Sequence, residues 1–74
     1  MAKLPRDLSG RQVVAGLQRL GFYFLHQRGS HMILRREDPK TTISVPDHRQ
    51  IRVGTLRTIL HQADVEIDQL LEVL

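Results

Sequence analysis

His31 is the residue whose type and neighbours best suit it to do chemistry in this chain. Gly29 and Ser30 precede it, and such small residues leave room for a ligand or a backbone to come close. An imidazole titrates near neutral pH, so it can take up or release a proton under physiological conditions. We therefore predict that His31 is a general base or a general acid. The alternative is a strand histidine that is merely hydrogen-bonded to a neighbour.

Positive charge gathers close to His31 along the chain. The bases concerned are Arg28, Arg35, Arg36 and Lys40. Cleavage of RNA needs a base that takes the proton of a ribose 2′-hydroxyl, and cations that stabilise the charge on the phosphate. We expect the four basic residues to bind RNA phosphates. Because the 2′-hydroxyl is a nucleophile within the substrate, we expect no metal and no other cofactor.

The other histidines and Tyr23 leave several interpretations open. His48 is a second acid or base, a phosphate contact, or a loop residue that caps a nearby helix. His26 and His61 are expected on the surface, and Tyr23 either stacks on a base or packs in the fold. The chain has no cysteine, and its histidines lack the spacing of metal ligands, so we predict no zinc site.

The first element that must position these residues is a helix over about residues 10–20. Ser9 and Gln12 have the spacing of a capping box, and Gly21 suits a left-handed C-terminal cap. Apolar residues recur at helical spacing. They are Val13, Val14, Leu17 and Leu20.

Three short segments rich in β-branched and aromatic residues predict strands, at residues 22–27, 30–36 and 41–46. The connections between them, at Arg28-Gly29 and at residues 37–40, are short enough to require an antiparallel meander. The third strand ends at Pro46, which cannot donate to a ladder.

Strand alternation divides the middle segment between two faces. His31, Ile33 and Arg35 share one face. The other face carries Ser30, Met32, Leu34 and Arg36. Periodicity does not say which of these faces the helices cover.

A loop over residues 47–53 leads to a second helix, opened by Gly54-Thr55. Backbone N–H groups near Gly54 could hold a phosphate, or they could simply be capped. The buried stripe of this helix is Leu56, Ile59, Leu60 and Ala63. Residues 66–74 form a last amphipathic turn or two that packs on the core or on a partner through Ile67, Leu70, Leu71 and Leu74.

These elements predict a single α+β domain over residues 1–74. A three-stranded sheet cannot bury an apolar face alone, and two helices laid across one face solve that problem. The expected architecture is an α-β-β-β-α(-α) two-layer domain, a three-stranded antiparallel sheet with helices on one face. This is the general shape of a double-stranded RNA-binding domain.

Charge and composition favour an anionic partner. All eleven Lys and Arg residues lie within residues 1–63 beside four acids, whereas residues 64–74 hold the other four acids. Such a basic body suits nucleic acid first. No segment approaches the roughly 20 apolar residues of a membrane span, and the N-terminal sequence lacks the apolar run of a signal peptide. We expect a cytoplasmic protein that does not contact membranes.

Several motifs, taken in order, resemble the HicA-type mRNA interferase toxins of bacteria and archaea. They are Gly21-Phe22, Gly29-Ser30-His31, Val45-Pro46-Asp47-His48, Gly54-Thr55-Leu56 and Ile59-Leu60-His61-Gln62-Ala63. The resemblance covers about residues 8–70, and the ordered set is more specific than any one motif. Asp64-Val65 stands where the family has Gly-Ile, a departure that affects a helix end.

The resemblance implies a double-stranded-RNA-binding-like fold, with His31 as the catalytic residue for mRNA cleavage. It also implies a HicB-type antitoxin partner that covers the active site. The leading hypothesis is thus the toxin of a type II toxin–antitoxin system, a metal-independent endoribonuclease. The alternative is a non-catalytic RNA-binding module of the same fold, which would leave bound RNA whole. A third hypothesis is a small protein-interaction domain, which would lack salt-dependent RNA binding.

Overall fold

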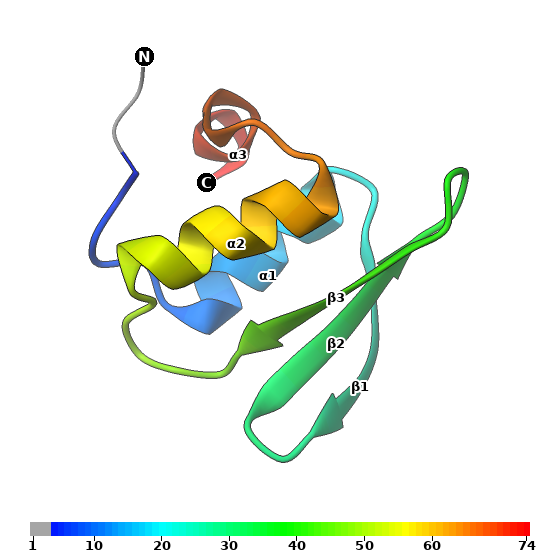
Figure 1. Cartoon of the computed structure of the whole chain (residues 1–74), viewed down its shortest axis with the longest axis horizontal. Coiled ribbons are helices and arrows are strands. Elements are labelled where there is room, and N and C mark those ends of the chain that lie inside the picture. Colours follow the sequence, from blue (N-terminus) through cyan, green and yellow to red (C-terminus); the bar gives the residue numbers. More distant parts are fainter. Residues whose placement is uncertain (1–3) are drawn as a thin grey trace.

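The computed structural model describes residues 4–74 and contains the elements that the sequence predicts, in the predicted order (Figure 1). They are α1 (Gly10–Arg19), β1 (Tyr23–Arg28), β2 (His31–Arg36), β3 (Thr41–Pro46), α2 (Val53–Ala63) and α3 (Ile67–Val73). The predicted α+β class is confirmed. Each boundary lies within a residue or two of its predicted position.

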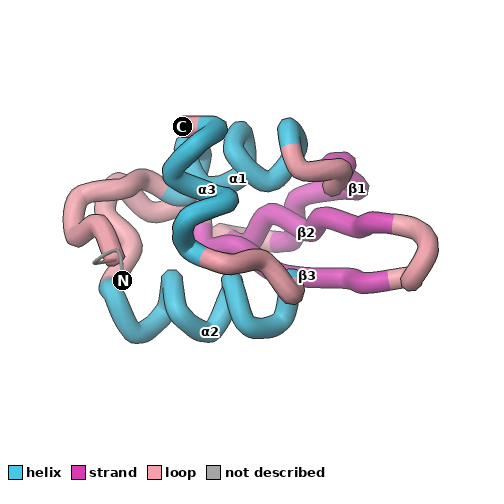
Figure 2. Tube along the Cα trace, turned by 90° about the horizontal axis from the view of Figure 1, so that it is seen from above, coloured by secondary structure: helices cyan, strands magenta, loops and turns pink. Residues whose placement is uncertain are grey.

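The three strands form one antiparallel sheet in the order β1-β2-β3. Helices α1 and α2 cover one face of it, and α3 packs on α1 on the side away from the sheet (Figures 1 and 2). We call the helix side the covered face and the other side the open face. Among residues 4–74, none of the three helices is long and apolar enough to cross a bilayer.

The hydrophobic core lies between the covered face and the helices. In β2 the side chains of Met32 and Leu34 are buried there, at 5% and 0% exposure. His31 is exposed, and Ile33 and Arg35 are only partly buried, so these three lie on the open face. The structure therefore settles which face of the strand the helices cover. The fully buried side chains of the core include Val13, Leu17, Val45, Ile51, Leu56 and Leu70.

Both ends of α1 follow the local chemistry of the sequence. The Ser9 hydroxyl accepts from the Gln12 N–H at 3.1 Å, and the Gln12 side chain accepts from the Ser9 N–H at 2.8 Å. This capping box was predicted. At the other end Gly21 has φ 104°, and the Phe22 N–H donates to the Leu17 carbonyl at 3.0 Å. That Schellman arrangement turns the chain out of the helix and buries Phe22 beside it.

The two C-terminal helices agree with prediction in part. The predicted stripe of α2 is buried, and α2 ends at Asp64, which adopts the left-handed conformation with φ 55°. The departure from glycine at this position therefore preserves the cap, because aspartate tolerates that conformation better than most residues. In α3 Leu70 is buried, but Leu71, and Leu74 directly after the helix, stay 37% and 47% exposed. A helix this short covers only one stripe of its surface.

Candidate active site at one end of the sheet

His31 begins β2 on the open face, directly after the β1–β2 hairpin loop. Its cross-strand partners are Arg28 on β1 and Pro46 on β3. Gly29 has φ 58° in the two-residue loop, a conformation that glycine adopts without the strain of a Cβ. The tight turn thus holds Arg28 and His31 side by side at one end of the sheet.

A β-bulge at Leu25 decides that Arg28 lies on the same face as His31. Before the bulge Phe24 pairs with Leu34, and after it Arg28 pairs with His31. Strict alternation from Phe24 would have turned Arg28 toward the covered face. The extra residue reverses the alternation, as bulges beside functional sites commonly do.

His31 and the β1–β2 loop form one side of the site. The segment after β3 forms the other side and is held by backbone hydrogen bonds. The Asp47 N–H donates to the Ser30 carbonyl at 2.7 Å, and the His48 carbonyl accepts from the Gly10 N–H at 2.8 Å. A side chain at Gly10 would overlap the Pro46 carbonyl. The first residue of α1 therefore fixes the backbone of His48 through an approach that only glycine permits.

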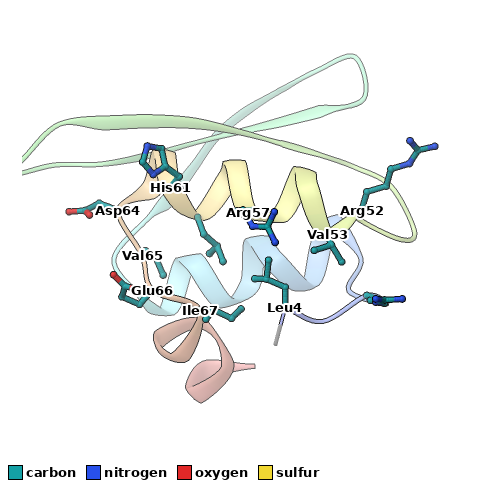
Figure 3. Close-up of a pocket in the computed structure, with 11 residues that line it drawn as sticks. Leu4, Arg52, Val53, Arg57, His61, Asp64, Val65, Glu66 and Ile67 are labelled. Atoms are coloured by element: carbon teal, nitrogen blue, oxygen red, sulfur yellow. The ribbon is translucent and has the colours of Figure 1, made fainter. Parts of the chain in front are cut away.

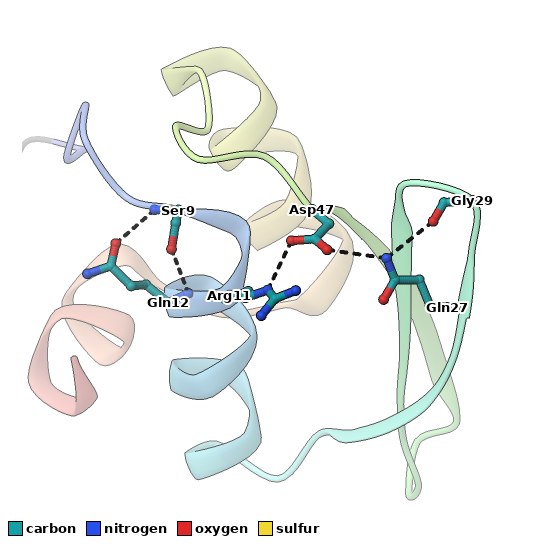
Figure 4. Close-up of polar contacts among 6 residues, drawn as sticks. All are labelled: Ser9, Arg11, Gln12, Gln27, Gly29 and Asp47. Atoms are coloured by element: carbon teal, nitrogen blue, oxygen red, sulfur yellow. Dashed lines mark hydrogen bonds and ion pairs between the residues drawn. The ribbon is translucent and has the colours of Figure 1, made fainter.

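Asp47 joins α1, β1 and the hairpin loop in a polar network (Figure 4). The Arg11 Nε lies 3.3 Å from its Oδ1, and the Gln27 Nε2 donates both to its Oδ2 and to the Gly29 carbonyl, each at 3.2 Å. The Arg11 hydrogen bond is the main cause that lowers the pKa of Asp47 below its ordinary value of 3.8, with Gln27 adding to the effect. The ionised carboxylate thus braces the loop that presents His31.

A cavity of about 460 Å³ opens between the start of β2 and the segment that follows β3. Its lining is His31, Pro46, His48, Gln50, Ile51, Arg52 and Thr55. The fold therefore brings together the two histidines that sequence reasoning selected, together with the start of α2. Both imidazoles are on exposed residues, so a substrate has access to them.

The N-terminus of α2 adds positive potential to this cavity. Its N-cap residue, Arg52, makes no side-chain capping hydrogen bond. The backbone N–H groups of a helix's first turn lack partners within the helix, and the helix dipole is positive there. Because Arg52 and Thr55 line the cavity, the first turn of α2 adjoins the two histidines. The structure therefore has no side-chain cap at this helix end, where capping was the alternative to phosphate binding.

A family model described as the HicA toxin of bacterial toxin–antitoxin systems matches residues 10–65. The chain belongs to the HicA toxin family. The match runs from the start of α1 to just beyond α2, and so includes the sheet and the whole histidine cavity. A search of curated proteins found no match. Membership of a family of toxin–antitoxin toxins points to an antitoxin partner.

None of the four basic residues predicted to bind RNA phosphates lines the cavity, and three of them lie far from His31. Arg35 is on the open face, four residues along β2 from His31, or about 13 Å at the usual rise of a strand. Lys40 lies in the β2–β3 turn, at the opposite end of the sheet. Only Arg28 is a direct neighbour of His31.

Arg36 is on the covered side and has structural contacts. Its Nη2 donates to the Ala63 carbonyl at the end of α2 at 3.1 Å, and its guanidinium lies 4.7 Å from the centre of the Phe22 ring. Its Nε is buried without a hydrogen-bond partner. A cation at a helix C-terminus is favourable, so these contacts tie α2 to the sheet.

Sequence reasoning missed Arg52 and Gln50 as cavity residues. Both lie in the loop before α2, where no periodicity indicates a direction for a side chain. The position of Gln50 depends on hydrogen bonds to residues distant in sequence, which no local pattern indicates. Its side chain donates to the Arg6 carbonyl at 2.8 Å, and the neighbouring Ile51 N–H donates to the Leu8 carbonyl at 2.7 Å.

A larger cavity, of about 920 Å³, lies between the N-terminal segment, α2 and the start of α3 (Figure 3). Apolar side chains such as Leu4 and Val53 line it together with Arg57 and His61. Arg52 lines both cavities, but His31 and His48 are confined to the smaller one. In residues 4–74 no three His, Cys, Asp or Glu side chains gather as a set of metal ligands.

Proposed function

We propose that this HicA-family toxin is a metal-independent endoribonuclease that cleaves mRNA, with His31 as its general acid or base. The observation that supports the proposal best is the cavity shared by His31, His48 and the N-terminus of α2. RNA cleavage through the 2′-hydroxyl needs two proton transfers and stabilisation of one phosphate. The cavity has one imidazole for each transfer and positive potential for the phosphate.

The chemistry is an internal transfer at phosphorus. The ribose 2′-oxygen forms a bond to phosphorus, and the bond from phosphorus to the 5′-oxygen of the next nucleotide breaks. One imidazole takes the 2′-hydroxyl proton, and the other gives a proton to the leaving 5′-oxygen. The products are a 2′,3′-cyclic phosphate and a free 5′-hydroxyl, and the reaction consumes no water or oxidant.

The phosphate has donors on two sides in this arrangement. Arg28 on β1 is the cross-strand partner of His31. Arg52 and the first turn of α2 line the cavity on the side opposite the sheet strands. Their charges stabilise the additional negative charge that develops on the phosphate oxygens. The rate depends on the position of the histidines relative to the phosphate as well as on their basicity, because misplaced reacting groups slow the reaction strongly.

The antitoxin partner is proposed to be of the HicB type and to cover this cavity. Two features support a covering partner: the cavity is open, and its histidines are exposed. An acidic protein surface placed there would meet the same cations as the phosphate. An mRNA substrate would place both proteins in the cytoplasm.

The test is cleavage of a mixed-sequence single-stranded RNA in EDTA by the wild-type protein and by His31→Ala. We expect at least a 100-fold loss of rate, since a general acid or base contributes about 10²–10⁴-fold. His61→Ala is the matched control, because His61 is also exposed but lies outside the cavity. It should cleave at the wild-type rate. All three proteins should first give the same circular dichroism spectrum.

Cleavage by folded His31→Ala would overturn the assignment of His31. Wild-type cleavage that stops in EDTA and returns with added Mg²⁺ would overturn the metal-independent mechanism. If all three proteins bind RNA and leave it whole, the protein is a non-catalytic RNA-binding module.

A further inference from the structure

The open face of the sheet extends the site with side chains suited to RNA. Directly paired residues of antiparallel strands point to the same side, so the register defines three rows across this face. Starting from the cavity, they are Arg28–His31–Pro46, His26–Ile33–Ser44 and Tyr23–Arg35–Thr42. The three strands contain no aspartate or glutamate. Apart from Ile33 and Pro46, the residues of these rows are basic or polar, and the strands contribute no carboxylate.

The row farthest from the cavity carries an aromatic side chain held in place. Tyr23 is 42% exposed, and its hydroxyl donates to Glu37 at 2.7 Å. That hydrogen bond is the main cause that raises the pKa of Tyr23 above 10.0. Beside it, the Arg35 Nε donates to the Thr42 hydroxyl at 3.3 Å. The side chains of Tyr23 and Arg35 are thus both oriented by hydrogen bonds.

We propose that the open face is a track for single-stranded RNA, on which the Tyr23–Arg35 row is a stacking subsite for a base beyond the two nucleotides that share the cleaved bond. The inference rests on the proposed function, because it places the cleaved phosphate at the His31 cavity. The row lies four residues along β2 from His31, about 13 Å away at the usual strand rise. A base stacked on Tyr23 therefore belongs to a nucleotide beyond the cleaved pair.

Single-stranded RNA fits this face better than a duplex. An aromatic ring that stands out from a sheet binds a base only when that base is unstacked from its neighbours. Proteins that bind single strands combine such rings with cations that follow the backbone. Here Tyr23 supplies the ring, and Arg28 and Arg35 supply the cations at the two ends of the face. The stacking subsite would make cleavage prefer unpaired segments.

Tyrosine fluorescence gives a direct measurement, because Tyr23 is the chain's only tyrosine and there is no tryptophan. The protein is the His31→Ala variant, and the probes are 2′-O-methyl oligouridines, which lack the nucleophile. An octanucleotide should quench the Tyr23 emission on binding, after correction for absorption by the bases. A dinucleotide is too short to reach from the cavity to Tyr23 and should leave the emission unchanged.

A pair of neighbouring aromatic residues provides the matched binding test. Tyr23→Leu should weaken binding of the octanucleotide about tenfold or more, in line with the effect of removing one base-stacking ring. Phe24→Leu removes an equally exposed ring, at 44%, but Phe24 pairs with Leu34 and so lies toward the covered face. It should bind as the parent does. Tyr23→Phe keeps the ring and should retain most of the affinity.

Two results would overturn the stacking subsite: no quenching by the octanucleotide, or equal losses for Tyr23→Leu and Phe24→Leu. These results are independent of catalysis, because quenching and affinity are measured without cleavage of the probe. Failure of the proposed function would instead appear as wild-type protein that binds RNA, with quenching, and never cleaves it. In that outcome the track survives as the surface of a binding module.

Discussion

The two faces of β2 differ in burial and in the chemistry that they expose, although their residues alternate along one short strand. On the covered face Met32 and Leu34 are buried among the helices. On the open face His31 is exposed, and Arg35 makes its hydrogen bond with Thr42 at the surface. The covered face excludes water and holds the domain together, whereas the open face keeps charge and imidazole groups available. Stability and RNA chemistry should therefore respond to different substitutions in the same strand.

The largest expected effect on stability comes from truncation on the covered face. Leu34→Ala leaves a cavity in a fully buried site, which costs about 2–5 kcal/mol and can unfold a domain this small. Ile33→Ala, one residue away on the open face, should cost less than about 1 kcal/mol. Urea denaturation of both variants measures the difference. Equal losses of unfolding free energy would mean that the two faces are not distinct.

A smaller effect on stability is expected where α1 supports the segment that carries His48. Gly10→Ala places a Cβ against the Pro46 carbonyl, so the segment that carries His48 must shift. We expect a loss of about 1–3 kcal/mol, typical of overpacking, together with slower RNA cleavage. Gly54→Ala is the control for stability, since nothing lies within 4 Å of its added Cβ. It should be neutral or stabilising by up to about 1 kcal/mol.

Wild-type stability in Gly10→Ala would show that the contact between α1 and Pro46 is loose. Wild-type stability combined with slow cleavage would place Gly10 in the chemistry itself, which contradicts its role as a support.

The smallest effect is a pH dependence of the stability, which comes from Asp47, the residue directly after β3. Its pKa is lowered in the folded protein, chiefly by Arg11. The stabilising contribution is therefore complete above the ordinary value of 3.8 and is lost as the pH falls through the lower folded value. Asp47→Asn should flatten the decline of Tm below about pH 4. Arg11→Gln should flatten it too, and an unchanged decline in both variants would contradict the assignment.

Most of the fold could be predicted from the sequence because its signals are local. The Ser9–Gln12 capping box and Gly21 mark the ends of α1, and each needs only residues within a few positions. Short turns impose the meander, and the stripe of α2 follows from its period. The exposure of Leu71 and Leu74 could not be predicted, because it depends on how much of α3 the rest of the domain covers.

The site was less predictable because it depends on register and on contacts distant in sequence. The bulge at Leu25 has no marker such as glycine, yet it decides that Arg28 accompanies His31. Arg36 has the same local sequence character as Arg35, but it lies on the covered face and contacts Ala63. His31 and His48 line the same cavity because Gly10 fixes the loop after β3. No local sequence pattern indicates this contact.

A single modified substrate distinguishes cleavage through the 2′-hydroxyl of the RNA itself from attack by any other nucleophile. A cleavage site is first mapped on a single-stranded RNA in EDTA, and the nucleotide on its 5′ side is then replaced by its 2′-deoxy form. We expect cleavage at that bond to disappear, while the unmodified RNA gives a 2′,3′-cyclic phosphate and a 5′-hydroxyl. Undiminished cleavage of the deoxy bond would mean that another nucleophile attacks phosphorus, and it would contradict the mechanism assigned to His31 and His48.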